Sequence, residues 1–89
     1  MDRAQPSLER LAQVLARRAA SQAQHYEDIA EGFWTPAVKV GRSSRWPSHE
    51  TDALLAAHIA GGTRDEIRSL VQHLVAERRR VFERFKPAA

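Results

Sequence analysis

The sequence predicts a mainly α-helical domain with one small β-hairpin, in the order helix, helix, hairpin, helix, helix. The chain has 89 residues, which is enough for one small domain. Apolar residues recur at helical spacing on both sides of a segment in which Val38 and Val40 alternate with Lys39. Gly41 and the two serines, Ser43 and Ser44, then supply turn signals and Pro47 ends the return strand, so residues 38–47 predict the hairpin.

The N-terminal part predicts a disordered lead over residues 1–6, followed by a helix. Ser7 is the candidate N-cap, and apolar residues from Leu8 to Leu15 share one helical face. Arg17 and Arg18 then suit the C-terminal end of this helix.

A second helix is predicted between Ser21 and Gly32. Ser21 and Gln24 have the spacing of a capping box, and Gly32 is a natural C-terminal stop. Neither glycine nor proline separates the two helical segments, so one long helix from Ser7 to Glu31 is an open alternative.

Two further helices follow the hairpin. Ser48 is the expected cap of the third helix, and Gly61 and Gly62 end it. Thr63 and Glu66 form the capping box of the last helix. Arg78 lies on its apolar row and is expected to extend its charged end into solvent. That row consists of Ile67, Leu70, Val71, Leu74, Val75, Phe82 and Phe85.

Composition narrows the functional classes. The chain has no cysteine, which excludes disulfides and cysteine-type zinc sites. The histidines lack metal-ligand spacing, and neither a Ser/His/Asp cluster nor a phosphate-cradling glycine loop is present, so we expect no metal, no cofactor and no enzymatic activity. The apolar runs are short and the N-terminus lacks a signal-peptide stretch, which predicts a cytoplasmic, nucleoid-associated protein without a membrane segment.

The predicted hairpin carries a local excess of positive charge. The whole chain has a net charge of +3, but Lys39, Arg42 and Arg45 lie on the hairpin without any acidic residue among them. Such a composition is typical of a surface that contacts a phosphate backbone. We expect these three cations to point outward. The residues expected to point inward are Val38, Val40 and Trp46. Trp34 and Trp46 are expected to pack the hairpin onto the helices.

A helix pair followed by a basic hairpin is the order of a winged helix-turn-helix, in which the second helix of the pair enters the major groove. Residues 21–46 resemble the core of AlpA-like phage and prophage regulators, which are small winged-helix proteins related to excisionases and to the MerR-type DNA-binding domain. The residues that match in order and spacing are Ser21, Tyr26, Ile29, Gly32, Pro36, Val38, Lys39, Gly41, Arg42, Ser43 and Trp46.

This resemblance covers roughly residues 8–76 and implies a sequence-specific, double-stranded-DNA-binding transcription regulator of phage or prophage type. The implied organisation is a DNA-binding domain over residues 7–76 and a basic helical extension with a tail over residues 77–89. Relatives usually carry a glycine in the turn between the first two helices, and the Arg18–Ser21 segment has none. Relatives also often carry a basic residue where this chain has Glu27 and Asp28.

The candidate DNA contacts come from the helix pair and the hairpin. Glutamine pairs with adenine and alanine contacts the thymine methyl group, so the start of the second helix is the candidate base reader; a solvated helix surface is the alternative. Arginine suits phosphate oxygens or a narrow minor groove. Tyr26 is a candidate phosphate contact, although a core position is the preferred interpretation, as it is for His25. The complete candidate set is Arg17, Arg18, Ser21, Gln22, Ala23, Gln24, Tyr26, Lys39, Arg42, Ser43, Ser44 and Arg45.

The expected partner is double-stranded DNA, bound by a homo-oligomer or by a cooperative array on repeated half-sites, because one module offers a small interface. Two alternatives stay open: an adaptor or antirepressor that acts on RNA polymerase or a recombinase, and an excisionase-like architectural factor. Whether the C-terminal cations contact DNA or a protein is also open. These cations are Arg78, Arg79, Arg80, Arg84 and Lys86.

Overall fold

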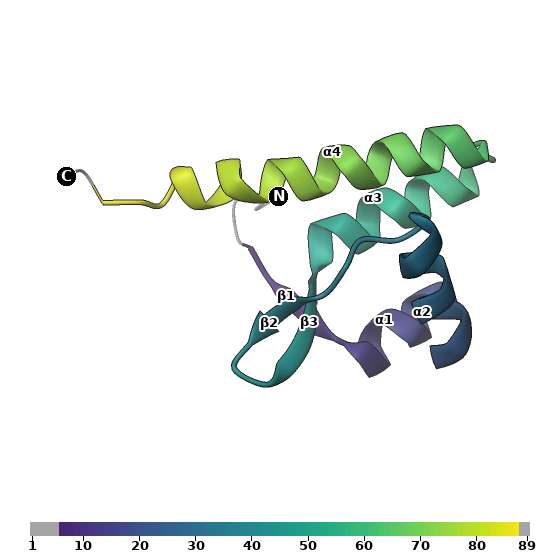
Figure 1. Ribbon diagram of the computed structural model, residues 1–89, viewed down its shortest axis with the longest axis horizontal. Helices are drawn as coiled ribbons and strands as arrows, with labels where there is room; N and C mark the ends of the chain where they lie inside the picture. The colour runs from purple at the N-terminus through teal and green to yellow at the C-terminus, as the bar shows by residue number, and fades with distance from the viewer. Residues whose placement is uncertain (1–5, 88–89) are drawn as a thin grey trace.

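The computed structural model describes residues 6–87, and this part of the chain forms four helices and one three-stranded antiparallel sheet (Figure 1). Apart from Pro6, the expected disordered lead lies outside the described residues. The elements in chain order are β1 (Leu8–Arg10), α1 (Leu11–Arg18), α2 (Gln22–Glu31), β2 (Val38–Val40), β3 (Ser43–Pro47), α3 (Ser48–Ile59) and α4 (Arg64–Glu83). The mainly helical class with a hairpin is therefore confirmed, and one strand precedes the predicted order.

Two helices, and not one long helix, precede the hairpin. α1 ends at Ala19, which adopts the left-handed conformation with φ 53° and ψ 45°. α2 starts after Ser21, whose hydroxyl oxygen accepts a hydrogen bond from the Gln24 backbone N–H over 3.1 Å. Gly32, with φ 84°, ends α2 as predicted. The single-helix alternative is wrong because the left-handed residue redirects the chain between the two segments.

Strand β1 occupies positions at which the sequence predicts the first turn of a helix. It pairs antiparallel with β3, so that Arg10 lies opposite Arg45. Ser7 does not cap a helix; its carbonyl oxygen accepts a hydrogen bond from the Ser48 backbone N–H over 2.9 Å. Pairing with β1 gives backbone partners to the edge of β3, which carries the buried Trp46.

The hairpin is present, with a tighter turn than the sequence predicts. Gly41 and Arg42 alone connect β2 to β3, and Val40 pairs with Ser43. The positive φ of 63° at Gly41 is the pattern of a type II′ turn. The two serines that were expected in the turn therefore belong to β3.

The C-terminal helices lie together on one side of the molecule, with α4 along α3, while α1, α2 and the sheet lie on the other side (Figure 1). The capping box of α4 is confirmed, because Thr63 and Glu66 exchange hydrogen bonds of 2.8 and 3.1 Å. Ser48 is the first helical residue of α3 and not its N-cap, which is Pro47.

The hydrophobic core joins all these elements. Trp34 and Trp46 are almost fully buried, and the Trp46 indole N–H donates to the Thr35 carbonyl oxygen over 2.9 Å. The two tryptophans thus pack the hairpin onto the helices, as the sequence predicts. The other buried apolar residues are Val14, Leu54, Ile67, Val71 and Leu74.

Arg78 points inward, contrary to the expectation that it would extend into solvent. Its Nε and NH2 atoms donate to the two carboxylate oxygens of the fully buried Glu50, both over 2.8 Å. NH2 also donates to the Pro36 carbonyl oxygen over 2.7 Å. The bidentate pair satisfies a buried charge on α3 with a charge on α4.

Candidate nucleic-acid interface

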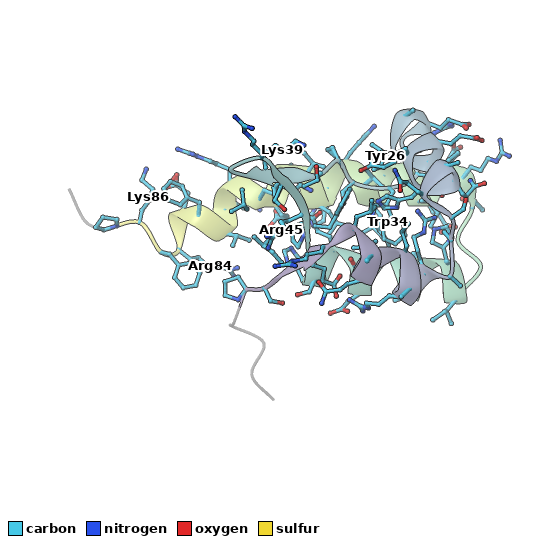
Figure 2. The ribbon with its side chains drawn as sticks, turned by 90° about the horizontal axis from the view of Figure 1, so that it is seen from below. Tyr26, Trp34, Lys39, Arg45, Arg84 and Lys86 are labelled. Atoms are coloured by element: carbon cyan, nitrogen blue, oxygen red, sulfur yellow. The ribbon has the colours of Figure 1, made fainter. Side chains whose placement is uncertain are left out.

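Helix α2 presents two chemically different surfaces to solvent. His25 is fully buried and Ile29 is half-buried, so these residues face the core. Gln22, Ala23 and Tyr26 are exposed, and Tyr26 follows Gln22 by four residues and Ala23 by three, which places it beside both on one face of the helix. This face carries no charge, and Tyr26 extends from it with 42% of its surface exposed, so the preferred interpretation of Tyr26 as a core residue is wrong (Figure 2).

Another face of α2, which we call the acidic face, carries Glu27, Asp28 and Glu31 together with the uncharged Gln24. They line an open hollow of about 340 Å³ together with Phe33, His58, Gly62, Arg64 and Ile67. Gln24 belongs to this surface, because its side-chain amide donates to Asp28 Oδ1 over 2.7 Å. Of the predicted base-reading residues, the structure therefore brings Gln22 and Ala23 together and turns Gln24 elsewhere.

Arg17 and Arg18 are held by carboxylates within the domain. Arg17 bonds to Glu9 and Asp52, and hydrogen bonds first to Asp52 and then to Glu9 raise its pKa above the usual value. Arg18 pairs with Asp28, its side chain is only 10% exposed, and its guanidinium lies 4.1 Å from the centre of the Trp34 ring. Both candidate phosphate contacts are therefore engaged with carboxylates inside the domain, Arg18 in a nearly buried position and Arg17 at the surface.

His25 lies at the centre of the packing between α2 and the sheet, in agreement with the preferred interpretation. Its ring centre is 4.8 Å from that of Trp46, and Arg18 NH1 lies 2.9 Å from its Nδ1 atom. Burial, and then the positive charge of Arg18, lower the pKa of His25 to about 4. The imidazole is therefore neutral at pH 7, which leaves Nδ1 to accept the hydrogen bond from Arg18.

The register of the hairpin places its cations on both faces of the sheet. Directly paired residues share a face, and Lys39 pairs with Ser44 while Val38 pairs with Arg45. Trp46, two residues after Ser44, shares the face of Lys39. The expected arrangement, with all three cations opposite Val38, Val40 and Trp46, is therefore wrong: Lys39 lies on the Trp46 face and Arg45 on the Val38 face.

The two serines of the hairpin orient its cations. Lys39 Nζ donates to Ser44 Oγ over 2.7 Å, and Arg45 Nε donates to Ser43 Oγ over 2.9 Å. Arg42 is exposed in the turn. The predicted hairpin residues are thus brought together, with Ser43 and Ser44 as positioning groups for the charged side chains.

Arg10 joins this positive surface, although the sequence places it in a helix. Within residues 6–87, Arg10, Lys39, Arg42 and Arg45 form no ion pair. The acid of the three strands, Glu9, bonds to Arg17. We call these four cations the sheet cations. A strand of three residues is too short to show an alternating pattern, so no local signal assigns Arg10 to this surface.

The C-terminal end of α4 carries a separate group of charges. Arg79 pairs with Glu83 over 3.4 Å, and Arg80 pairs with Glu77 over 2.8 Å. Phe82 is 50% exposed in the same stretch, and Figure 2 shows Arg84 and Lys86 at the end of the molecule farthest from Tyr26. This group is therefore distinct from the sheet cations and from the uncharged face of α2.

Comparisons of the chain with family models, with curated protein sequences and with solved structures gave no match. Among residues 6–87, no three His, Asp or Glu side chains are arranged to hold a metal ion. None of the helices in this range is both long and apolar enough to cross a bilayer.

Proposed function

We propose that this protein is a sequence-specific, double-stranded-DNA-binding transcription regulator with a winged helix-turn-helix fold. The observation that carries the proposal is that the sheet cations, which form no ion pair within residues 6–87, lie on the sheet that borders the uncharged face of α2, where the ring centres of Tyr26 and Trp46 are 6.4 Å apart. Positive charge without internal partners is the electrostatic feature that phosphate binding requires. An uncharged helix face with a glutamine and an alanine is suited to base edges.

In this proposal, α2 is the recognition helix and the β2–β3 hairpin is the wing. Gln22 reads a base edge, Ala23 contacts a thymine methyl group and Tyr26 reaches a phosphate. The acidic face of α2 is turned toward the hollow beside α4, which keeps its charge off the phosphates. Ser21 acts through the helix as its cap.

The distribution of charge on the wing favours insertion into a groove over contact with a single backbone. Lys39 and Arg45 lie on opposite faces of the hairpin, and Arg42 lies at its tip. A hairpin between two phosphate strands needs cations on both faces, whereas a hairpin lying on one strand needs them on one face. Arginine at the tip matches the negative potential of a narrow minor groove.

The resemblance to AlpA-like regulators supports a role in phage or prophage gene control. One such module contributes an interface of about 600–1,000 Å², so tight binding requires a homo-oligomer or several copies on repeated half-sites. An excisionase-like architectural role uses the same surfaces and differs in bending the duplex, which circular-permutation gel shifts measure directly.

The proposal is tested by the salt dependence of binding to a random-sequence duplex, followed by anisotropy. Replacing Arg42 and Arg45 together with alanine should lower the slope of log K against log salt by about 2, because each lost phosphate contact contributes about 0.9. The matched control replaces Arg84 and Lys86, which removes the same charge at the far end of α4. Equal slopes for the hairpin variant and the unmodified protein would reject the wing.

Base reading is tested separately by selecting bound duplexes from a random pool. Gln22→Ala should relax the enriched motif at one position, because a good bidentate contact discriminates against a wrong base by about 1–3 kcal/mol. An unmodified protein that enriches no motif would exclude sequence-specific regulation.

A protein-interaction adaptor that acts on RNA polymerase or a recombinase is the second candidate function. It is favoured by the acidic face of α2, which lines an open hollow, and by the exposed Phe82 and Phe85 at the end of α4. Under this alternative, the purified protein lacks DNA affinity. Charge reversal at Glu27 and Glu31 should then abolish co-purification of RNA polymerase or of a recombinase.

A further inference from the structure

Arg10 and Arg45 lie directly opposite each other in the antiparallel pair of β1 and β3. Side chains in such a pair share one face of the sheet, with their Cβ atoms about 4.5–5.5 Å apart. Two like charges in this position repel each other and destabilise the pairing. Pairing of β1 with β3 therefore has an unfavourable electrostatic contribution in the protein without a ligand.

Nothing in the described part of the chain neutralises this arginine pair. Glu9 belongs to the opposite face, since it pairs with Trp46, and its carboxylate is bonded to Arg17. The third residue of the row, across β3 on β2, is the apolar Val38. Within residues 6–87, the strand positions paired with these two arginines thus supply no carboxylate to them.

The arginine pair also offers hydrogen-bond donors to a ligand. Arg45 donates through Nε to Ser43 Oγ over 2.9 Å, and within residues 6–87 its two terminal nitrogens have no acceptor. Arg10 is exposed, and its backbone N–H donates to Gln13 Oε1 over 2.8 Å, which fixes the backbone at the junction of β1 and α1. Two guanidinium groups that start from paired positions on one face of a sheet can together match the oxygens of one phosphate.

We propose that Arg10 and Arg45 together bind one phosphodiester group of the duplex, so that β1 forms part of the DNA interface. This inference rests on the proposed function. It assigns the Val38 face of the sheet to one phosphate backbone, while Lys39, on the other face, contacts the backbone across the groove. The bound phosphate removes the repulsion between the two arginines.

The first test measures binding of the unmodified protein, Arg10→Gln, Arg45→Gln and the double variant to a random-sequence duplex. Each single variant should weaken binding, and its deficit should shrink about 3.5-fold between 50 and 200 mM salt, because one lost contact changes the slope by about 0.9. The double variant should lose less than the product of the two single losses, since both changes break the same contact. Arg84→Gln is the matched control and should bind normally.

The second test separates a free anion from a duplex phosphate. The Tm of each protein is measured in sodium sulfate and in sodium chloride at equal ionic strength. The increase in sulfate should be larger for the unmodified protein and for Arg84→Gln than for Arg10→Gln. Arg10→Gln should also be at least as stable as the unmodified protein in dilute chloride, because the repulsion is gone.

The outcomes are distinguishable. If Arg42→Gln weakens duplex binding while Arg10→Gln leaves affinity and salt slope unchanged, the arginine-pair site is rejected and the proposed function stands. If the unmodified protein does not bind duplex DNA, the proposed function fails and the phosphodiester assignment fails with it; a sulfate effect lost in Arg10→Gln then identifies a site for free anions. Additive losses in the double variant would reject a shared phosphate.

Discussion

Ala19 is the position where one substitution should stabilise the protein. It lies between α1 and α2 in the left-handed conformation, with φ 53° and ψ 45°. The Ala20 N–H bonds to the Leu15 carbonyl over 3.1 Å and the Ala19 N–H to the Ala16 carbonyl over 3.4 Å, which is the pattern of a Schellman motif. Glycine is the residue that this motif favours, so Ala19→Gly should relieve strain without changing the turn.

The magnitude follows from two opposing contributions. A left-handed conformation costs an L-residue with a Cβ atom about 1–2 kcal/mol. Glycine also increases the conformational freedom of the unfolded chain, which lowers the stability of the folded protein by roughly 0.4–1 kcal/mol. The expected net gain is about 0.5–1 kcal/mol, which corresponds to a rise in Tm of roughly 2–8 °C for a domain of this size.

Urea denaturation followed by circular dichroism measures the change in the free energy of unfolding. The matched control is Ala16→Gly, an exposed site inside α1 with right-handed geometry, where glycine should cost about 0.5–1 kcal/mol. The two substitutions should therefore shift the midpoint in opposite directions. If Ala19→Gly destabilises the protein as much as Ala16→Gly does, the left-handed turn between α1 and α2 is refuted.

Three further predictions concern buried charge and the hairpin turn. Acidification should lower the free energy of unfolding by on the order of 3 kcal/mol, because the pKa of His25 falls from an ordinary 6.5 to about 4 on folding. This contribution to stability is complete above pH 6.5, declines between pH 6.5 and 4 and is lost below pH 4. In His25→Gln, the urea midpoint should vary less across that pH range. Arg78→Met should lower the free energy of unfolding by about 3–5 kcal/mol, because it leaves the buried Glu50 unpaired, and adding Glu50→Leu should restore much of this loss. A double variant no more stable than Arg78→Met would contradict this account. Gly41→Ala should lower the Tm although the site has open space, because φ is 63°; an unchanged melting curve would argue against the tight turn.

Elements with local signals were predictable from the sequence. Ser21 and Gly32 bound α2 because a hydroxyl cap and a left-handed glycine act within a few residues of the chain. The Thr63–Glu66 capping box starts α4 for the same reason. Gly41 likewise marks the turn of the hairpin.

Features that depend on distant partners were not predictable. Strand β1 exists because β3 lies beside it, and the apolar Leu8 fits a helix face equally well in the sequence. Arg78 is a charge on an apolar row in the sequence, and only the fold brings its partner Glu50 to it. In both cases the deciding partner is more than 25 residues away in the chain.

The candidate site was predicted in composition and only partly in geometry. Lys39, Arg42 and Arg45 lie on the hairpin, but the faces on which the cations lie depend on the number of residues in the turn, since a shift by one residue inverts the alternation. In the sequence, Arg17 and Arg18 have no evident ion-pair partners, because Asp52 and Asp28, which bind them, belong to other helices. Side-chain availability is therefore a property of the folded molecule.

The pairing of β1 with β3 makes the helix pair part of a closed ring of chain. Contact between Arg10 and Arg45 closes a loop of 35 residues (45 minus 10), and this loop contains both α1 and α2. Closing a loop of this length costs about 3 kcal/mol of chain entropy beyond a constant. The contacts that offset this cost form only when both strands are in place. Folding of the helix pair and completion of the sheet should therefore be one cooperative event, and a ligand that ties β1 to β3 would slow the local opening of α2.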